Sequence, residues 1–583
     1  MRRIIIHKDL CTGCKSCVVA CMTRNCSEKH KFDSFIDVNK DKYFIDLSHV
    51  DTESRNHIEL NNEGHPVPLT CRHCDKPECV ATCMSGAMTK DSITGIVSYD
   101  EKRCGSCYMC VMSCPYGILK PDDRTKQDII KCDLCKEEDI PLCVYNCPSG
   151  ALELQSEEVE LSSDVATTSQ ENIKTYVIIG ASIAGITAVK TIRELDKSAK
   201  IIVVSKDEKI YSRCMLHHVI SEHRTIDGIN FVDEDFINKQ DATWIKKATV
   251  KSIDPDNKKI KYEKENKEEE LAYDKLLITA GANAFIPPIK NLRDAKNVYP
   301  LRNIEDAVMI REKAKYSKRI VIMGAGLVGM DALAGLVELD NVGTLTLIAS
   351  EDRILDKQLD IRAAKVYEEK FEQKGVKILK NCMASEVFLD EDGNIKGIGI
   401  KNGEIIPCDL LIVSTGVRSN IEIVKGSGIE TEKGIKINEK CETNKQDIYA
   451  AGDITGTGIW PLATKQAQVA ATNMAGKKAT IDDTFEFKNT MNFMGIPTVS
   501  IGFITPADDT YDVFTYTDGE NYKKAVIKDN VLTGFIAQGD ISYVGVYTQL
   551  IKDKIKVENL KERVFDLGYS DFFKIKEDGQ FEW

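Results

Sequence analysis

The last two thirds of the chain repeats one pattern, in which an apolar run leads through a glycine-rich turn into a helical stretch. Residues 175–180 form such a run before the turn GASIAG at 180–185, and helical periodicity follows from Ile186. Residues 319–323 lead in the same way into GAGLVG at 324–329. Continuous apolar runs of this length are typical of parallel strands that are buried on both faces. The pattern predicts two α/β domains, each with a nucleotide-binding turn.

Further strands are expected from shorter runs at 201–204 and 345–348. Apolar and polar residues alternate at 43–47 and 57–60, and turn residues follow at 61–64, which predicts a β-hairpin. Short β runs from 484 to 583 predict a further α+β domain. No apolar stretch approaches the length of a membrane-spanning helix, so no membrane span is expected.

The first part of the chain is organised by cysteine instead. Of 21 cysteines, 17 precede residue 151, and 16 of these fall into four groups of four with closely related spacings such as C-x2-C-x2-C-x3-C. Three closely spaced thiolates hold one [4Fe–4S] cluster, while the fourth reaches a neighbouring cluster and often precedes proline. The sequence therefore predicts four [4Fe–4S] clusters. The ligand groups are Cys11, Cys14, Cys17, Cys21; Cys71, Cys74, Cys79, Cys83; Cys104, Cys107, Cys110, Cys114; and Cys132, Cys135, Cys143, Cys147.

Zinc and disulfides are the alternatives for these cysteines. Zinc sites use separated pairs of ligands around one tetrahedral ion, which does not suit three ligands and a displaced fourth. Disulfides need an oxidising compartment, and the first residues do not resemble a secretory signal. Cys26 lies outside the fourfold pattern and is interpreted as an ordinary thiol without a ligand role.

Length and charge narrow the class of protein. The chain has 583 residues, which is enough for about four domains. Its formal net charge of −13 argues against nucleic acid and fits a redox protein that meets protein partners. Oxygen-sensitive clusters predict a reducing cytoplasmic location. Residues 155–172 are acidic and rich in Ser and Thr, so they read as a linker.

The cysteine region carries a family resemblance at PLTCRHC (68–74), SGAM (85–88) and CVMSCPYG (110–117). Residues 1–153 resemble the four-cluster electron-transfer subunits of the molybdopterin-oxidoreductase type, with most likeness to the iron–sulfur partner protein of CO dehydrogenase. The resemblance implies that each group lends its last cysteine to a partner group's cluster. The implied ligand sets are Cys11, Cys14, Cys17 with Cys147; Cys132, Cys135, Cys143 with Cys21; Cys71, Cys74, Cys79 with Cys114; and Cys104, Cys107, Cys110 with Cys83.

The two glycine turns match the dinucleotide-binding pattern to different degrees. In the first, Gly180 permits a tight turn and Gly185 allows helix and strand to pack, so that a pyrophosphate sits on the helix N-terminus, but Ser182 replaces the middle glycine. Asp207 or Glu208, after the next strand, could hold a ribose hydroxyl. The second turn is complete, and two such turns argue for two dinucleotides.

The choice between NADH and NADPH stays open at the second turn. The position after the following strand that usually holds an acid for the NADH ribose is Ala349. Asp352 and Arg353 lie further along the chain.

Three more motifs, LLITAG (276–281), LIVSTGVR (411–418) and IYAAGD (448–453), complete a second resemblance. Residues 173–583 resemble the pyridine nucleotide–disulfide oxidoreductase superfamily, in which the residue matching Asp453 hydrogen-bonds the flavin ribityl chain. The resemblance implies FAD at Gly180, Ser182, Gly185, Asp207, Glu208, Arg213, Thr279, Gly281, Gly452 and Asp453, and NAD(H) or NADP(H) at Gly324, Gly326, Gly329, Asp331 and Gly416.

The expected architecture is α/β plus α+β, with an N-terminal polyferredoxin domain before a two-dinucleotide flavoprotein. The expected parts are the cluster domain at 1–153, the linker at 154–172, the FAD domain at 173–286 and 411–480, the NAD(P) domain at 287–410 and an interface domain at 481–583. In the superfamily the last domain usually forms a dimer, so a homodimer is expected.

Cys214 has two interpretations. The superfamily's C-x4-C dithiol is absent, and YSRCML at 211–216 places one cysteine where CoA-disulfide reductases and NADH oxidases carry a redox thiol. Cys214 is therefore either a redox thiol, with Arg213, His217 and His218 near it in sequence, or a packing residue in a loop beside the flavin. We favour packing.

The combination predicts an FAD-dependent NAD(P)H:iron–sulfur oxidoreductase. A nicotinamide exchanges a hydride and a cubane exchanges one electron, so a flavin is needed between them. The expected partner is a low-potential enzyme, with CO dehydrogenase favoured over a molybdenum or tungsten enzyme, formate dehydrogenase or hydrogenase. Two alternatives are a thiol, CoA-disulfide or peroxide reductase that uses Cys214, and an interaction module whose flavin half is a vestigial scaffold.

Overall fold

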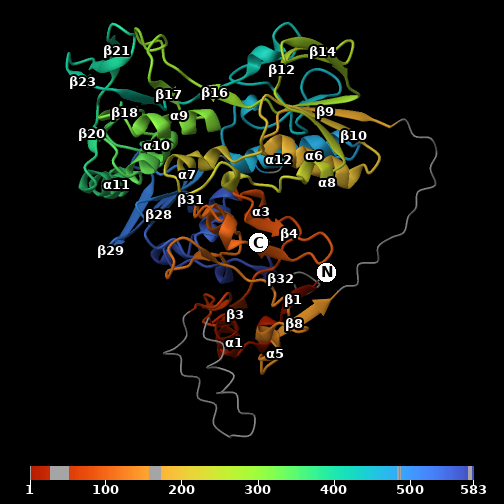
Figure 1. Ribbon diagram of the computed structural model, residues 1–583. Coiled ribbons are helices and arrows are strands. Elements are labelled where there is room, and N and C mark those ends of the chain that lie inside the picture. The colour runs from red at the N-terminus through yellow and green to blue at the C-terminus, as the bar shows by residue number, and fades with distance from the viewer. Residues whose placement is uncertain are drawn as a thin grey trace. The chain divides into compact units, whose positions relative to one another are not determined.

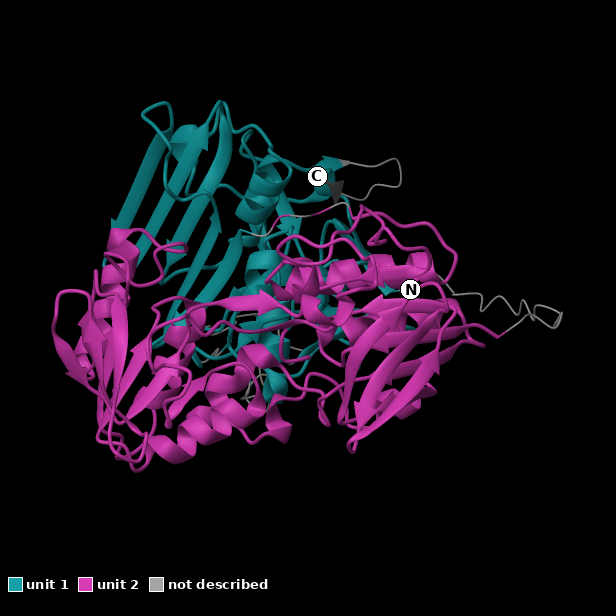
Figure 2. Cartoon of the chain, turned by 90° about the horizontal axis from the view of Figure 1, so that it is seen from above, with its two compact units in different colours: residues 1–83, 87–165, 487–583 teal, residues 84–86, 166–486 magenta. Residues whose placement is uncertain are grey.

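A computed structural model describes residues 2–26, 52–156, 173–481, 483, 485, 487–575 and 581–583. The chain divides into two compact units (Figure 2), one of residues 1–83, 87–165 and 487–583 and one of residues 84–86 and 166–486. Among the residues described, no helix is long and apolar enough to cross a membrane. Each unit is treated separately below.

The larger unit contains a five-stranded parallel sheet around the first glycine turn. Its strand order is β11-β10-β9-β15-β26, and the helices α6 and α12 pack together beside it (Figure 1). The residues of β9, β15 and β26 are mostly buried, as is typical of a parallel sheet covered on both faces, whereas the edge strand β11 is only partly buried. The elements are β9 (Thr175–Ile179), α6 (Ile183–Leu195), β10 (Lys200–Val204), α7 (Leu216–Ile220), α8 (Phe236–Lys239), β11 (Ala242–Ile245), β12 (Ala248–Asp254), β13 (Lys259–Lys264), β14 (Lys267–Ala272), β15 (Lys275–Ile278), β16 (Ala282–Ala284), β25 (Val417–Ser419), β26 (Ile448–Ala450) and α12 (Trp460–Met474).

A second parallel sheet in the same unit surrounds the second glycine turn, with the order β17-β24-β18-β19-β20. A three-stranded antiparallel sheet, β21-β22-β23, lies between β20 and β24 in the chain. The elements are β17 (Val298–Pro300), α9 (Ile304–Ala314), β18 (Arg319–Met323), α10 (Leu327–Val337), β19 (Thr344–Ile348), α11 (Ile361–Gln373), β20 (Lys377–Leu379), β21 (Ala384–Leu389), β22 (Ile395–Ile400), β23 (Ile405–Pro407) and β24 (Leu410–Val413).

Two sequence predictions for this unit need correction. The return to the FAD domain at 411 is too early, because β24 pairs with β17 and β18 and so belongs to the second sheet. Helix α6 begins at Ile183 rather than Ile186, since Ser182 already takes the N-cap position. The class of fold, with two parallel-sheet domains, is as predicted.

In the other unit, the cluster domain is built from short elements between cysteines. Each helix carries the third cysteine of one group: Cys17 in α1, Cys79 in α3, Cys110 in α4 and Cys143 in α5. The strands form two-stranded pairs, and β1 pairs with β8 to join the two ends of the domain. The elements are β1 (Arg2–Ile6), α1 (Ser16–Asn25), β2 (His57–Leu60), β3 (Pro66–Leu69), α3 (Glu78–Ala81), β4 (Met88–Lys90), β5 (Val97–Tyr99), α4 (Met109–Ser113), β6 (Lys120–Pro121), β7 (Ile129–Ile130), α5 (Leu142–Tyr145) and β8 (Leu152–Ser156).

The predicted hairpin and linker are found only in part. Strand β2 pairs with β3 across the turn at 61–64, whereas residues 43–47 lie outside the described residues. Strand β8 continues to Ser156, so the first three residues of the predicted linker belong to a strand. Residues 157–172 also lie outside the described residues.

The C-terminal domain belongs to the same compact unit as the cluster domain. It is an antiparallel sheet, β27-β28-β31-β30-β29, with helix α13 against it. Helix α13 also packs on α4: Thr548 donates a hydrogen bond of 2.7 Å from Oγ1 to the carbonyl of Met112. The elements are β27 (Lys488–Phe493), β28 (Ile496–Gly502), β29 (Asp512–Asp518), β30 (Asn521–Lys528), β31 (Val531–Gln538), α13 (Gly545–Lys552), β32 (Lys574–Ile575) and β33 (Phe581–Glu582).

Candidate cofactor sites

Two cysteine groups face common cavities in the combinations that the first resemblance implies. One cavity is lined by Cys21, Cys132, Cys135 and Cys143, and a second by Cys11, Cys14, Cys17 and Cys147. In each cavity, one ligand comes from the opposite end of the cluster domain. The pairing of β1 with β8 explains this, because it brings the first and last cysteine groups together.

The two inner groups lie close enough to affect one another's pKa values. Cys74 is close enough to Cys71 and Cys114 for their charges to raise its pKa, which burial and these charges together bring to about 12. The pKa of Cys110 is raised well above its usual value by burial and then by the charges of Cys107, Cys83 and Cys104.

The crowded, buried thiols of these groups need positive charge nearby if they are to ionise. Burial and neighbouring thiolates also raise the pKa of Cys17 to about 11 and that of Cys143 to about 12, so anionic sulfurs are unfavourable there without a cation. Iron replaces the protons and supplies the missing positive charge. Among the residues that the structure describes, no three metal-ligating side chains converge on a single metal ion. Two small cavities are instead lined by four cysteines each.

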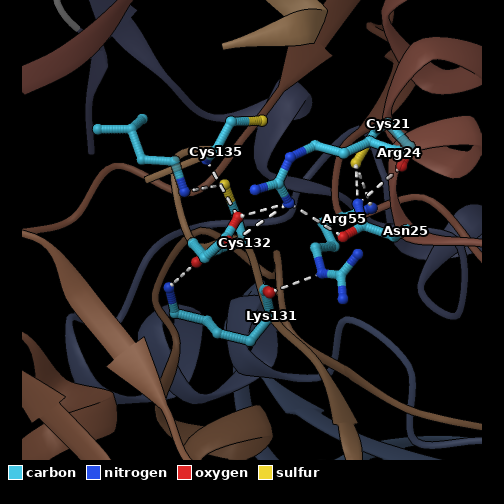
Figure 3. Close-up of polar contacts among 9 residues, drawn as sticks. Cys21, Arg24, Asn25, Arg55, Lys131, Cys132 and Cys135 are labelled. Carbon is cyan, nitrogen blue, oxygen red and sulfur yellow. Dashed lines mark hydrogen bonds and ion pairs between the residues drawn. The ribbon is translucent and has the colours of Figure 1, made fainter. Parts of the chain in front are cut away.

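Peptide N–H groups support the thiolates. Leu134 donates to Cys132 Sγ at 3.3 Å, Arg55 to Cys21 Sγ at 3.3 Å, and Met88 to Cys83 Sγ at 3.4 Å. Figure 3 shows the contacts around Cys21 and Cys132. Hydrogen bonds to sulfur are one of the means by which a protein sets cluster potential.

In the larger unit, a cavity of about 480 Å³ lies at the first glycine turn. Its size is in the range of cofactor pockets. It is lined by eight of the ten residues predicted for FAD: Gly180, Ser182, Asp207, Arg213, Thr279, Gly281, Gly452 and Asp453. Gly185 and Glu208 are not among its lining residues.

Gly185 lies beneath the turn. A Cβ atom on it would be 2.0 Å from the carbonyl oxygen of Gly180, so only glycine allows α6 to approach the strand. Gly180 has φ +112°, and a Cβ there would be 2.3 Å from the carbonyl oxygen of Thr279. Ser182, the replacement for the middle glycine, caps α6 where a pyrophosphate would sit.

Four charged residues of the cavity form two pairs. Asp207 accepts a hydrogen bond of 2.9 Å from Arg213, and Asp453 accepts one of 2.6 Å from Arg302. Of the two carboxylates considered for the ribose, Asp207 lines the cavity, while Glu208 forms an ion pair of 2.6 Å with Lys247. Of these two carboxylates, only Asp207 therefore faces the cavity.

The second turn has the same construction. A Cβ on Gly324 would be 2.5 Å from the carbonyl oxygen of Ser414, and one on Gly329 would be 1.9 Å from that of Gly324. A Cβ on Gly326 would meet no atom within 4 Å, so this glycine faces open space at the start of α10. These residues fit a second dinucleotide whose pyrophosphate approaches Gly326.

The other two residues predicted for the second dinucleotide are Gly416 and Asp331. Gly416 follows β24 with φ +107° and has no atom within 4 Å of its Cβ position. Asp331 lies in α10, 3.9 Å from His217, and burial raises the pKa of its carboxyl group to about 8.

Cys214 is not among the residues that line the cavity. It packs against the core beside α6 and α12. Burial, followed by the charges of Asp331 and Asp453, raises the pKa of its thiol to about 12. These surroundings suit a packing residue better than a reactive thiolate.

The sequence did not reveal several residues around the sites. Arg302 reaches Asp453 across a long chain separation, and no local motif marks it. Lys131 is a buried lysine directly before Cys132, a position that could have drawn attention because buried lysines are rare.

Together, the fold and its sites define a flavoprotein oxidoreductase with two dinucleotide-binding domains and an attached iron–sulfur domain. Residues 174–473 match the model of the family described as Pyridine nucleotide-disulphide oxidoreductase, residues 63–157 match the 4Fe-4S dicluster domain, and residues 488–555 match the Rubredoxin NAD+ reductase C-terminal domain. The chain belongs to the pyridine nucleotide-disulphide oxidoreductase family. It is an NAD(P)H-dependent, FAD-containing enzyme that passes electrons to [4Fe–4S] clusters.

Individual relatives agree with this membership. The chain is 30% identical over 402 residues to subunit epsilon of NADH-dependent phenylglyoxylate dehydrogenase from Aromatoleum evansii, covering 67% of this chain and 94% of the relative. It is 29% identical over 372 residues to the assimilatory nitrate reductase electron transfer subunit of Bacillus subtilis, covering 62% of this chain and 47% of the relative. NADH:rubredoxin oxidoreductase from Clostridium acetobutylicum has the same fold, with a TM-score of 0.55 at 24% identity over 68% of this chain and all of that structure.

Proposed function

We propose that the chain carries four [4Fe–4S] clusters and transfers electrons between a low-potential partner enzyme and NAD(P)+. The observation that supports this proposal is the set of sixteen cysteines, grouped four by four around common centres in one unit. The proposed ligands are the crossed sets given by the first resemblance.

The flavin connects two kinds of electron transfer. When bound, it exchanges two electrons with a nicotinamide and single electrons with clusters. The chain's part is to hold the dinucleotides, with Ser182 and Gly326 opening the helices that receive the pyrophosphates and Asp453 facing the FAD cavity.

Names of relatives support a role as one component of a larger enzyme. Two of them are called a dehydrogenase subunit and a reductase electron transfer subunit. Because the cluster domain resembles the iron–sulfur partner of CO dehydrogenase, we favour a CO dehydrogenase as the partner. A molybdenum or tungsten enzyme, formate dehydrogenase and hydrogenase are the other outcomes that a search for the partner can return.

Metal analysis tests the cluster count. Protein purified anaerobically should contain about sixteen iron and sixteen acid-labile sulfide per chain, four of each per cluster. About eight of each, or zinc in place of iron, would contradict the proposal.

Cys147→Ser tests the crossed ligand sets. It should change the EPR signal of the cluster at Cys11, Cys14 and Cys17, with Cys26→Ser as a control that changes no signal. A change in the cluster at Cys132, Cys135 and Cys143 instead would show that the sets are not crossed.

Copurification tests the partner. The chain should be isolated anaerobically from native cells together with an enzyme of low-potential substrate chemistry, and that pair should reduce NAD(P)+ with the enzyme's substrate. Isolation of the chain alone, with rapid disulfide or peroxide turnover that Cys214→Ser abolishes, would favour the thiol-reductase alternative.

A further inference from the structure

Lys131 is a buried cation between two cysteine groups. Its side chain is only 5% exposed, and Nζ donates a hydrogen bond of 2.9 Å to the carbonyl of Val97 and another to the carbonyl of Cys132. Burial lowers the pKa of its ammonium group, but the neighbouring thiolates of Cys71, Cys132 and Cys79 raise it, and the net shift is upward. These sulfurs belong to two proposed clusters, the one at Cys71 and the one at Cys132.

The surrounding structure fixes the position of this lysine. The peptide of Val97 accepts from Lys131 and also donates its N–H to Nδ1 of the buried His73 at 3.0 Å. The carbonyl of Lys131 accepts a hydrogen bond of 2.8 Å from Nε of Arg55 (Figure 3). The ammonium group is therefore held on both sides and has little freedom to turn toward solvent.

Other cations are distributed unevenly over the four groups. The charge of Arg24 opposes the rise in pKa that burial causes at Cys135, and Arg24 also forms an ion pair of 3.3 Å with Asp133. The charge of Arg72 has the same effect on the pKa of Cys74. The Cys104 group, by contrast, has a carboxylate as a neighbour. Burial and also the charge of Asp128 raise the pKa of Cys104, and Asp128 accepts a hydrogen bond of 2.9 Å from the hydroxyl of Tyr99. Compared with the Cys104 group, the two groups that share Lys131 thus have cationic surroundings.

We propose that Lys131 is a shared counter-ion that raises the reduction potentials of the two clusters whose sulfurs it faces. Reduction adds one electron to a cluster and makes or breaks no bond, so the reduced state carries one more negative charge. A buried ammonium is weakly screened and stabilises that charge. Electrons that enter from NAD(P)H through the flavin, or from the partner enzyme, then rest first on this pair of clusters. The inference depends on the four-cluster proposal above.

The test is an EPR-monitored redox titration of the complete, cluster-loaded enzyme, with dithionite as the reductant. In Lys131→Met, the ratio of reduced to oxidised cluster at a fixed potential should fall at least about tenfold for two clusters, which is about 59 mV for a one-electron couple. Lys131→Arg keeps the charge and should keep both ratios within about threefold of the wild type.

Two further variants separate this effect from a general loss of charge. Arg24→Gln should lower the potential of one cluster, the one at Cys135, because its charge acts on that group. Lys76→Met removes an exposed lysine from the loop between Cys74 and Cys79 and should move no potential.

Each outcome decides the question. Unchanged potentials in fully loaded Lys131→Met would overturn the inference and leave the four-cluster proposal intact. Loss of iron from Lys131→Met and Lys131→Gln, with normal loading of Lys131→Arg, would assign the lysine to cluster assembly and also overturn it. A wild type with only two clusters would refute the proposed function itself, which iron analysis shows before any titration.

Discussion

At the scale of single residues, the two dinucleotide domains repeat one device. The hydroxyl of Thr279 donates to the carbonyl of Ile179 at 2.8 Å, and that of Ser414 donates to the carbonyl of Met323 at 3.0 Å. Each hydroxyl follows one strand and binds the carbonyl of the residue just before the glycine turn, at the end of the neighbouring strand. The motifs at 276–281 and 411–418 mark where these residues stand, but the contact itself depends on parallel pairing between strands far apart in the chain.

The glycines of the second turn allow a prediction that separates binding from folding. Gly326→Leu should leave FAD content and melting temperature near wild type, because nothing in the protein lies within 4 Å of the Cβ position. Reduction of the flavin by NAD(P)H should fall by more than about tenfold, since the side chain would occupy the pyrophosphate's approach. Stopped-flow absorbance measures the rate.

Gly329→Ala is the matched control, with the opposite pattern. Its Cβ would be 1.9 Å from the carbonyl oxygen of Gly324, so the fold should lose about 1–3 kcal/mol. If Gly326→Leu instead released FAD while nicotinamide binding survived, the two turns would have been assigned in reverse.

Cys214 gives a prediction with a defined pH dependence. A thiol whose pKa is about 12 is ionised in about one molecule in ten thousand at pH 8. Its alkylation by iodoacetamide should therefore be slow and should rise about tenfold per pH unit from 7 to 10 without a plateau. Mass spectrometry of the Cys214 peptide follows the reaction in the holoenzyme, and a plateau below pH 9 would indicate a reactive thiolate.

At the scale of elements, the contact between α13 and α4 is the feature that the sequence did not predict. A Cβ on Gly545 would be 2.0 Å from the carbonyl oxygen of Cys114, and one on Gly117 would be 2.7 Å from Val546. Glycine at both positions lets the C-terminal domain approach the backbone beside a cluster ligand. Gly117 ends the CVMSCPYG motif and Gly545 lies in no recognised motif, but the role of both glycines in this contact arises only from tertiary packing.

This contact bears on the expected homodimer. The resemblance placed a dimer interface in the C-terminal domain, and the structure uses α13 of that domain for the cluster domain. A homodimer stays a prediction.

The packing of α13 can be tested by graded substitutions. Gly545→Ala should lower the melting temperature and the iron content, because the added methyl collides with two main-chain carbonyls, those of Cys114 and Val111. Thr548→Val should cost about 1 kcal/mol, since it leaves the buried carbonyl of Met112 without its hydroxyl donor. Thermal unfolding followed by circular dichroism measures both, and Thr548→Ser should restore most of the loss. Wild-type behaviour of Gly545→Ala would show that the two domains do not pack in this way.

At the scale of the whole molecule, sequence reasoning succeeded where local patterns determine structure. Cysteine spacing identified every group that the structure gathers, and the apolar runs with their glycine turns identified both parallel sheets. It failed where distant segments meet: the assignment of β24 to the second sheet, the ion pair between Arg302 and Asp453, and the place of Lys131 between two cysteine groups. Each of these depends on pairing or packing that no local window of sequence contains.

The electron capacity of the holoenzyme tests the combined molecule. Anaerobic titration with dithionite should consume about six electrons per chain, two for the flavin and one for each of four clusters. Because Lys131 favours reduction of two clusters, the first electrons should appear in EPR signals that Lys131→Met weakens, before the flavin absorbance is fully lost. The Cys214→Ser variant should have the same capacity, since its thiol takes no part. A total near four electrons would mean two clusters, and a total that falls by about two in Cys214→Ser would place that thiol in the redox chemistry.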